Sequence, residues 1–551
     1  MRRAVPFLLL MIGSAALLLG GLGRLPLLGR DESLYAEAAR EMAATGDWIT
    51  PRVNGGPFFE KPPLNYWLAA VCFRTFGVST FAARLPAALA ALLTVALTAA
   101  LGARLWGRRA GLLAGIALLT SLQIAIIGRM GIMDVPLMCL TTLALLAYAR
   151  WRTARGPSLI LMPIAFGLSV GLAVLLKGLA GLLPVGIAGL HWLASCLPRR
   201  GVASATGSHT RSILRPFLAV LTVVLVCLAV AVPWFHAMAN LHGNPFVSTL
   251  LGREHLARIA QPMQGHGGSV LYYLGVIAVS FFPWIIFLPP ALLSRAGRAD
   301  QAQALWHSLL VVWFAAVLIP FSLISTKLPG YVTPLFPAMA LLVGAELDRR
   351  LDEPRRALWI AVIVGAVALA GLTSLLPSVG ARLGDPIGAA HAASRLIPPA
   401  VVWIAGYGVI VLGAATALSR RAHAALALVV TGQMVAVGAV LIGILPVLSP
   451  YLEGGRESRL AELAQRELPQ SQVVLYDTRP EAVAFVLGRP VRCYGRDEAE
   501  QALSLLKDGP TALIAPAKDE GLWEGLPVRR VWSVGDRVLL DIPRVTGNPQ
   551  R

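Results

Sequence analysis

Long apolar segments recur along this chain of 551 residues, and they constrain its fold more than any other feature. A predominantly apolar segment of about 20 residues can cross the hydrocarbon core of a bilayer as a helix. Hydrophobic residues make up 56% of the sequence and charged residues only 14%, whereas soluble domains carry about 25% charge. We therefore expect a polytopic α-helical membrane protein with about 13 transmembrane helices. The expected spans are 4–23, 80–102, 109–128, 135–149, 158–176, 178–197, 215–236, 269–292, 303–324, 331–347, 357–376, 398–418 and 424–449.

Clusters of arginine follow these spans at alternate ends. Loops rich in arginine and lysine stay in the cytoplasm, so all the clusters are expected on that side. This arrangement accounts for most of the formal net charge of +19, and nucleic acid is therefore not an expected partner. The two longer loops, 24–79 and 237–268, fall on the opposite, extracytoplasmic side. The clusters are Arg2/Arg3, Arg104/Arg108/Arg109, Arg150/Arg152/Arg155, Arg199/Arg200/Arg211/Arg215, Arg295/Arg298, Arg349/Arg350/Arg355/Arg356 and Arg420/Arg421.

The composition changes after about residue 450. The segments "VVLYD", "TALIA" and "RVLLDI" have the pattern of short strands, and "EAVAFVLG" and "EAEQALSLLK" that of helices. We therefore expect two domains, a membrane domain over 1–450 and a small soluble α/β domain over 451–551. Thirteen spans that start inside would put the second domain outside the cytoplasm.

The five cysteines show no C-x-x-C spacing, and four of them lie in or beside apolar segments. The sequence therefore predicts neither a disulfide framework nor a zinc site of cysteines.

Acidic residues at the mouth of the first span, in "LLGRDESLYAEAARE", are unexpected because carboxylates do little for membrane orientation. Asp31 and Glu32 lie there, and Tyr35 suits a helix at the interface. Later in the same loop, Glu60 and Lys61 follow the "NGGP" turn on a segment that "KPP" keeps irregular. The simpler alternative is an interfacial loop with ordinary solvated charges.

Further charges lie at the outer ends of later spans. Asp134 precedes Pro136, so it either caps a helix or faces the same water layer as Asp31. Lys177 interrupts a long apolar stretch at a tight hairpin between two spans, where it is either functional or extends to the interface. The segment "REHLARI" adds Arg253, His255 and Arg258, and "TKLPGYVTPLFP" adds Lys327 and Tyr331.

One outer face thus collects both carboxylates and cations. Cations in this number suit a phosphate or diphosphate group that enters from the lipid, and a carboxylate suits a general base for a hydroxyl. The pattern predicts transfer of a group from a lipid-linked phosphate carrier to a hydroxyl acceptor.

Several segments carry a resemblance to a known family. "RDESLYAEAAREM", "GDWITPRVNGGPFFEKPPLNYWL" and "RLPAALAALL", followed by "MDVPL", "LLKGLAGLLP", "REHLARI" and "TKLPGYVTPLFPA", resemble blocks of the bacterial aminoarabinose transferases that modify lipid A. That family belongs to the GT-C membrane glycosyltransferases, with protein O-mannosyltransferases as distant relatives. The match covers roughly the first 340 residues in order.

The resemblance implies roles for individual residues. Asp31 resembles the essential carboxylate near the reacting groups, and Asp134 the second acid of the same cavity. Lys61, Lys177 and Tyr331 resemble a carrier-phosphate site. The remaining expected substrate-binding residues are Tyr35, Glu60, His255 and Arg258. Glu60 and His255 also match positions that could hold a divalent ion, but two ligands do not define a metal site. Leu34 departs from the family pattern, which often has an arginine at that position.

These observations predict an integral-membrane glycosyltransferase of the bacterial inner membrane, with its active site on the periplasmic side. Its expected donor is a polyprenyl-phosphate sugar, and its expected acceptor is lipid A or another envelope glycolipid or glycan. The enzyme alternative is a protein O-mannosyltransferase. One alternative of another class is a lipid or sugar flippase or a transporter, which would carry charges near the middle of its spans. Another is a non-catalytic envelope assembly protein.

Overall fold

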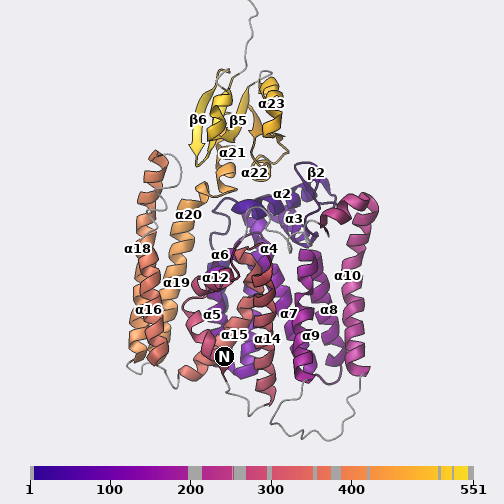
Figure 1. Cartoon of the computed structure of the whole chain (residues 1–551), viewed down its shortest axis with the longest axis vertical. Helices are drawn as coiled ribbons and strands as arrows, with labels where there is room; N and C mark the ends of the chain where they lie inside the picture. Colours follow the sequence, from indigo (N-terminus) through magenta and orange to yellow (C-terminus); the bar gives the residue numbers. More distant parts are fainter. Residues whose placement is uncertain are drawn as a thin grey trace, which may run out of the picture.

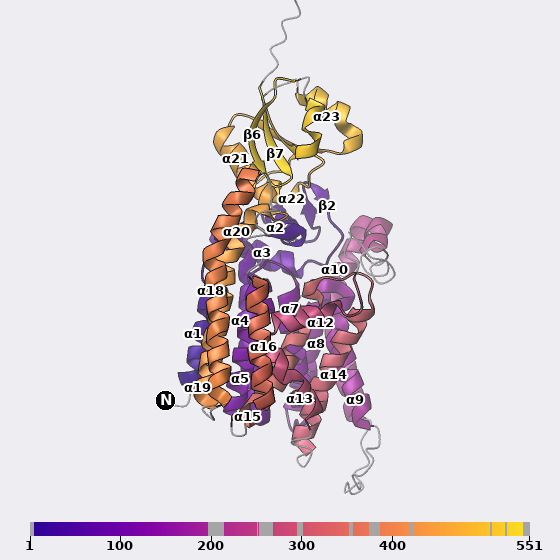
Figure 2. The ribbon, with the colours of Figure 1, turned by 60° about the vertical axis from the view of Figure 1, so that its left-hand side comes forward.

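The computed structural model describes residues 5–196, 214–250, 252, 268–294, 301–351, 356–373, 386–418, 422–506, 510–523 and 526–543. Long helices form a bundle, and a small sheet domain lies beyond one end of it (Figure 1). The helices α2 (Gly29–Thr45) and α3 (Leu64–Phe76) lie between the bundle and the sheet domain in both views (Figures 1 and 2).

The helices of the bundle correspond to the apolar segments of the sequence. They are α1 (Val5–Leu19), α4 (Thr80–Trp106), α5 (Arg108–Leu119), α6 (Leu122–Ile127), α7 (Asp134–Arg152), α8 (Ser158–Lys177), α9 (Leu183–Cys196), α10 (Leu214–Val247), α12 (Tyr272–Ser280), α13 (Leu288–Leu293), α14 (Gln301–Leu323), α15 (Phe336–Arg350), α16 (Arg356–Thr373), α18 (Pro386–Leu418), α19 (Ala422–Gly438) and α20 (Leu445–Leu448).

The described helices do not confirm the number of membrane spans that the sequence pattern predicts. Among the described residues, seven helices are long and apolar enough to cross a membrane, or eight if the pair Tyr272–Ser280 and Trp284–Leu293, bent by 111°, counts as one span. Val5–Leu19 and Arg356–Leu372 are apolar but shorter. A multi-pass helical membrane protein is therefore confirmed, and the predicted count of 13 is not.

The chain reverses direction at the expected hairpin after α8. Gly178 ends this helix with a φ of +60°, a value that favours glycine. A Cβ atom at Gly181 would lie 2.3 Å from the backbone of Ala173, so residues 178–182 fold back against α8. Lys177 is the last residue of α8 and therefore lies at this turn.

The first long loop forms a folded layer at the end of the bundle. Alanine and glutamate favour the helical conformation of α2, which ends at Gly46, where φ is +75° and the N–H donates to the Met42 carbonyl. A hairpin of β1 (Arg52–Val53) and β2 (Gly56–Pro57) follows, and its turn residues Asn54 and Gly55 both have positive φ. Almost every residue of α2 after Asp31 is buried, so α2 is an internal helix and not only an interfacial one.

A buried ion pair fixes α2 to the bundle. Glu32 in the first turn of α2 accepts two hydrogen bonds from the Arg84 guanidinium of α4, each 2.8 Å long. The same carboxylate accepts from the backbone N–H groups of Leu28 at 2.6 Å and Gly131 at 2.7 Å. The two side chains are 0% and 3% exposed. Because four donors satisfy this carboxylate, Glu32 joins α2, α4 and the segment before α7 at one point.

Arg84 also fixes the chain between α1 and α2. Its guanidinium donates to the backbone carbonyls of Leu22 at 3.0 Å, Leu25 at 2.9 Å and Pro26 at 2.6 Å. Glu32, which the sequence grouped with the acids of the outer face, is thus a structural residue, since its buried carboxylate is already saturated with donors.

The sheet domain has five strands in the order β4-β3-β5-β7-β6. The strands β3, β4 and β5 are parallel, while β7 is antiparallel to both β5 and β6. The predicted strands and helices of this region are confirmed, and β4, β6 and α21 were not predicted. The elements are α21 (Gly455–Glu467), β3 (Gln472–Tyr476), α22 (Glu481–Leu487), β4 (Arg492–Tyr494), α23 (Ala499–Leu506), β5 (Thr511–Pro516), β6 (Arg529–Val534) and β7 (Arg537–Ile542).

Specific backbone contacts hold the sheet domain on the first loop. Asn54 in the hairpin turn donates to the Val491 carbonyl at 3.0 Å and accepts from the Val491 N–H at 2.8 Å. Arg40 of α2 donates to the Gly488 carbonyl at 2.9 Å. The first loop is therefore enclosed between the bundle and the sheet domain.

The buried ion pair gives a prediction about stability. Arg84→Met leaves the Glu32 carboxylate buried without its partner, which typically costs about 3–5 kcal/mol. We expect a clear fall in the midpoint of thermal unfolding in detergent. Arg109→Met is the matched control, since Arg109 pairs with Asp348 while its side chain is 44% exposed, and should change the midpoint little. Equal midpoints for the two variants would contradict the anchoring role.

Candidate functional site

The central contact of the candidate site is an ion pair between two helix ends. Lys177 Nζ at the C-terminus of α8 donates to Asp134 Oδ1 at the N-terminus of α7, at 2.7 Å. The side chains are 15% and 13% exposed. Each charge also complements the partial charge of its own helix end. Met133 occupies the N-cap position without a side-chain cap, so the capping alternative for Asp134 is not supported.

The segment before α15 closes one side of this ion pair. The Tyr331 ring lies over Lys177, with Nζ 5.2 Å from the ring centroid. A Cβ atom on the preceding Gly330 would lie 2.9 Å from Cγ of Asp134, so only a residue without a side chain lets the backbone approach this carboxylate. Gln123 donates to the Pro329 carbonyl at 2.8 Å and fixes the segment in place.

The first turns of α2 face the same region. Asp31 is exposed, and its negative charge lies near the Lys177 ammonium group and the Tyr35 phenol. Tyr35 lies one turn later and is 5% exposed, with its ring centroid 5.9 Å from that of Tyr66. Burial, followed by the negative charges of Asp31 and Asp134 among its neighbours, raises the pKa of the Tyr35 phenol well above its usual value. This phenol therefore stays protonated and acts as a hydrogen-bond donor.

Glu60 and Lys61 lie at the other end of the first loop, and the charge of Glu60 acts on Tyr35. Glu60 Oε1 accepts a hydrogen bond from Arg30 at 3.1 Å, and the two side chains are 18% and 20% exposed. Lys61 is 9% exposed, and its Nζ donates to the Glu60 carbonyl at 3.1 Å. These charges are enclosed by the protein, which argues against the alternative of an ordinary solvated loop.

The two expected residues of the second long loop, His255 and Arg258, lie outside the described residues. The described stem of that loop reaches the first loop, because the Phe246 ring packs edge-on against Phe59, with centroids 5.8 Å apart. No group of three or more His, Cys, Asp or Glu side chains that could hold a metal ion occurs in the described part of the chain. The divalent ion near Glu60 and His255 stays a prediction.

Lys327 has a structural role that differs from the sequence interpretation. Its Nζ donates to the carbonyls of Phe321 at 3.1 Å, Ser322 at 2.6 Å and Ile324 at 2.5 Å, at the end of α14. A cation at the C-terminus of a helix satisfies carbonyls that have no partner within the helix. Lys327 is therefore a capping residue and not a cation of the site.

Sequence reasoning missed three residues that position the site, namely Arg84, Gln123 and Gly330. An arginine in an apolar span is a recognisable signal, because such a charge needs a buried partner. The glycine and the glutamine act through contacts between segments about 200 residues apart, and the sequence pattern gave no signal for them.

The site thus presents a paired lysine, two carboxylates and a protonated phenol beside one another. An ammonium group has three N–H donors, and its bond to Asp134 uses only one, so Lys177 can also hold an anion. An exposed carboxylate such as Asp31 can accept a proton from a hydroxyl. The arrangement suits displacement of an anionic leaving group by a hydroxyl.

Solved structures share this architecture. The chain resembles the crystal structure of ArnT from Cupriavidus metallidurans in the apo state, with a TM-score of 0.78, 26% sequence identity and complete coverage of both chains. The structure of the same protein bound to undecaprenyl phosphate gives a TM-score of 0.81 at 24% identity, and covers 99% of this chain and 100% of that one. The archaeal oligosaccharyltransferase AglB from Archaeoglobus fulgidus gives 0.51 at 13% identity, over 93% of this chain and 69% of that one. The fold is that of the membrane glycosyltransferases, as the sequence resemblance implied.

Sequence comparisons identify the family. The model of the dolichyl-phosphate-mannose-protein mannosyltransferase family matches residues 28–242. The undecaprenyl phosphate-alpha-4-amino-4-deoxy-L-arabinose arabinosyl transferase of Edwardsiella ictaluri is 30% identical over 82% of this chain and 79% of its own length. The enzyme of the same name from Pectobacterium carotovorum is 32% identical over 64% of each chain.

The chain is a membrane glycosyltransferase. It belongs to the family of undecaprenyl phosphate-alpha-4-amino-4-deoxy-L-arabinose arabinosyl transferases. The expected enzyme class is thus confirmed over the alternative interpretations.

The close approach of Gly330 to Asp134 gives a prediction about activity. Gly330→Ala would displace the carboxylate from Lys177, and we expect transfer to fall at least about tenfold, since small misplacements of catalytic groups are costly. The control is Gly275→Ala in α12, where a Cβ atom meets nothing within 4 Å. Both rates are measured on purified protein of equal thermal stability. Normal transfer by Gly330→Ala would show that this contact does not position Asp134.

Proposed function

We propose that this glycosyltransferase moves a sugar from a polyprenyl-phosphate carrier to a hydroxyl of an envelope acceptor such as lipid A. The observation that carries the proposal is the cluster of Lys177, Asp134 and Tyr331, which three separate segments bring together beside Asp31. The names of the relatives support undecaprenyl phosphate as the carrier and 4-amino-4-deoxy-L-arabinose as the sugar.

The reaction we propose is a single displacement at the anomeric carbon of the sugar. The acceptor oxygen forms the new bond to this carbon while its proton passes to the carboxylate of Asp31. The bond between the carbon and the phosphate oxygen breaks, and the phosphate of the carrier leaves with the electron pair, so the anomeric configuration is inverted. Asp134 holds Lys177 in position, and the ammonium groups of Lys177 and Lys61 stabilise the charge that develops on the phosphate.

The supporting residues have roles in the same reaction. Tyr35 and Tyr331 bound the space in which the sugar and the phosphate would lie. The Glu60 carboxylate orients Arg30 by accepting its hydrogen bond. Lys61, the next residue, donates to the Glu60 backbone carbonyl. We assign His255 and Arg258 to substrate binding from the family resemblance alone.

The acids give the first test of the proposal. Asp31→Asn removes the proton acceptor and Asp134→Asn removes the partner of Lys177, so each should lower transfer by at least about 10²-fold. Both variants should insert into membranes and keep their thermal stability. Transfer is measured as sugar added to lipid A in reconstituted vesicles, with Glu467→Gln as a control, since the Glu467 side chain lies in the sheet domain and is 42% exposed. Near-normal transfer by Asp31→Asn would show that Asp31 is not the proton acceptor.

The lysines give the second test, because residues that bind the carrier phosphate should affect the affinity for the donor. Lys61→Ala and Lys177→Ala should each weaken donor binding by about 1.5–3 kcal/mol, the value of one charged hydrogen bond. Lys518→Ala, in the sheet domain, should leave donor binding unchanged. Titrating donor at saturating acceptor, and then the reverse, separates the two affinities. Normal donor affinity with a loss confined to the acceptor would assign the cations to an anionic acceptor instead.

We also propose that the site and the sheet domain face the periplasm of the bacterial inner membrane, with a membrane domain over 1–450 in 13 spans and a soluble domain over 451–551. The arginine clusters support this orientation. Alkaline phosphatase fused at residue 460 should be active, and a cytoplasmic reporter at the same position should be silent. A silent alkaline phosphatase and an active cytoplasmic reporter would show that the sheet domain faces the cytoplasm.

A further inference from the structure

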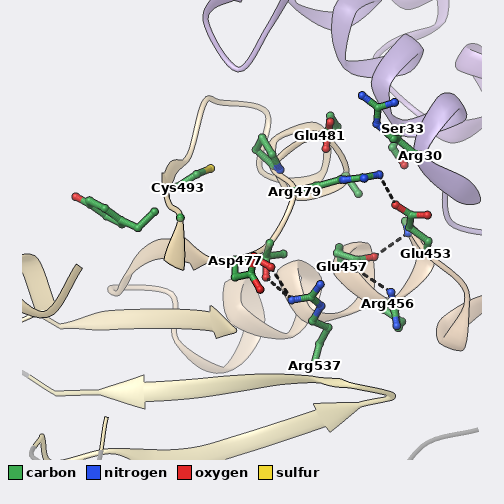
Figure 3. A pocket seen from close by; sticks show the side chains of 16 residues that line it. Arg30, Ser33, Glu453, Arg456, Glu457, Asp477, Arg479, Glu481, Cys493 and Arg537 are labelled. Carbon is green, nitrogen blue, oxygen red and sulfur yellow. Dashed lines mark hydrogen bonds and ion pairs between the residues drawn. The ribbon is translucent and has the colours of Figure 1, made fainter. Parts of the chain in front are cut away.

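A pocket lies between the sheet domain and α2, outside the cluster around Lys177 (Figure 3). Its volume is about 540 Å³, within the usual range of ligand sites. Arg30 and Ser33 of α2 line one side, and residues of the sheet domain line the rest. Arg30 also donates to Glu60, so one side chain connects this pocket to the candidate active site.

The pocket lies where open α/β sheets commonly bind ligands. From β3 the chain continues to β4 on one side of the sheet and then crosses to β5 on the other side, so the strand order reverses at β3. Ligands bind such sheets at the carboxyl ends of the strands at this point. Asp477 and Thr478, which follow β3, and Gly495, which follows β4, line the pocket. Asp477 has a φ of +42°, a strained value for a residue with a side chain.

The wall of the pocket contains hydrogen-bond donors without acceptors. The Nε atoms of Arg30, Arg456 and Arg537 are buried and have no hydrogen-bond partner within the described chain. Other nitrogens of these side chains are engaged, such as Nη1 of Arg537, which donates to the Asp477 carbonyl at 2.8 Å. Buried donors without partners are costly, so three of them around one pocket favour a ligand rich in acceptor oxygens.

The carboxylates of the wall do not oppose an anion as strongly as their number suggests. Glu453 pairs with Arg479 at 2.8 Å, and Glu457 accepts from the Gly454 N–H at 2.7 Å. Asp477 pairs with Arg496 at 2.8 Å. Glu481, the fourth carboxylate of the lining, is 9% exposed, and burial raises its pKa, which favours its neutral form. Arg479, the fourth arginine of the lining, is 55% exposed and can reach a ligand at the open side.

Close backbone contacts join the start of α2 to the sheet domain beside the pocket. The Gly29 N–H donates to the Glu453 carbonyl at 2.6 Å. Gly454 has a φ of +81°, and a Cβ atom there would lie 2.8 Å from Oγ of Ser33. The pocket is therefore built at a fixed junction, with α2 carrying Arg30 on this side and Asp31 toward the candidate active site.

We propose that this pocket binds the phosphorylated sugar headgroup of the glycolipid acceptor, so that the sheet domain selects the acceptor. This inference rests on the proposed function. Phosphate oxygens meet the arginine donors, and Tyr494 gives the sugar ring an amphipathic wall. The acceptor would approach from the sheet domain while the donor occupies the site at Lys177.

Acceptor kinetics on the full-length enzyme test the proposal. Arg456→Gln should raise the KM for lipid A about tenfold or more and leave the KM for the donor unchanged, as expected for one lost charged hydrogen bond. Arg459→Gln is the matched control on the same helix, since Arg459 is 51% exposed and outside the pocket lining, and it should behave as wild type. An unchanged acceptor KM in Arg456→Gln would overturn the proposal while leaving the proposed function intact.

Thiol modification of the unaltered protein gives a test that does not depend on folding of a variant. Cys493 lines the pocket and is exposed, and Cys196, also exposed, at the end of α9 is the internal reference. Lipid A in detergent micelles should slow maleimide modification of Cys493 severalfold, by mass action, without an effect at Cys196. Chemically dephosphorylated lipid A should protect little. Equal protection by inorganic phosphate, or none by lipid A, would overturn the proposal.

If wild-type enzyme transfers no sugar to lipid A but lipid A still protects Cys493, the pocket stands and the proposed function fails. If the enzyme transfers sugar to lipid A but lipid A does not protect Cys493, the proposed function stands and the acceptor pocket fails. The two ideas are therefore distinguishable in one set of experiments.

Discussion

The buried ion pair between Glu32 and Arg84 is the contact on which the rest of the site depends. A charge taken out of water is stable only when partners surround it, and here the carboxylate has four donors while the guanidinium also satisfies three carbonyls. Through these bonds one pair joins α2, α4, the chain between α1 and α2, and the segment before α7. Asp31 lies in α2, and Asp134 begins α7 directly after the joined segment, so their common location follows from this pair.

The ion pair that we propose to act in the reaction, Lys177 and Asp134, differs from the structural pair in its surroundings. Lys177 and Asp134 lie at the adjoining ends of α8 and α7, where helix dipoles favour their charges, and they are partly exposed. Lys177 keeps donors that Asp134 does not use, whereas the Glu32 carboxylate has no capacity left. The residue type alone therefore does not separate a structural acid from a catalytic one, and the number of buried donors around each carboxylate does.

The layer formed by the first loop links two binding regions. One side of α2 faces the bundle and the cluster at Lys177. On the other side, Arg40 of α2 and Asn54 of the following hairpin bind the sheet domain. Arg30 and Asp31 are consecutive residues near the start of this helix, yet they serve the interdomain pocket and the candidate active site respectively. A rigid helix between the two would hold donor and acceptor in a fixed relation, which is a requirement for transfer between two bound substrates.

The sequence by itself determined the membrane class, the helical hairpin at Lys177, the α/β character of the last hundred residues and the glycosyltransferase family. These features depend on local apolarity, on turn residues and on motifs that are continuous in the chain, so they are visible without a structure. The number of spans is not confirmed, because among the described residues only seven helices, or eight with one bent pair, are long and apolar enough to cross a membrane. Apolarity alone does not fix the length of a helix. Only the tertiary structure decided that Glu32 and Lys327 are structural, that Gly330 lies against Asp134 and that a pocket separates α2 from the sheet domain. These facts arise from contacts between residues far apart in sequence, and composition, periodicity and spacing carry no record of such contacts.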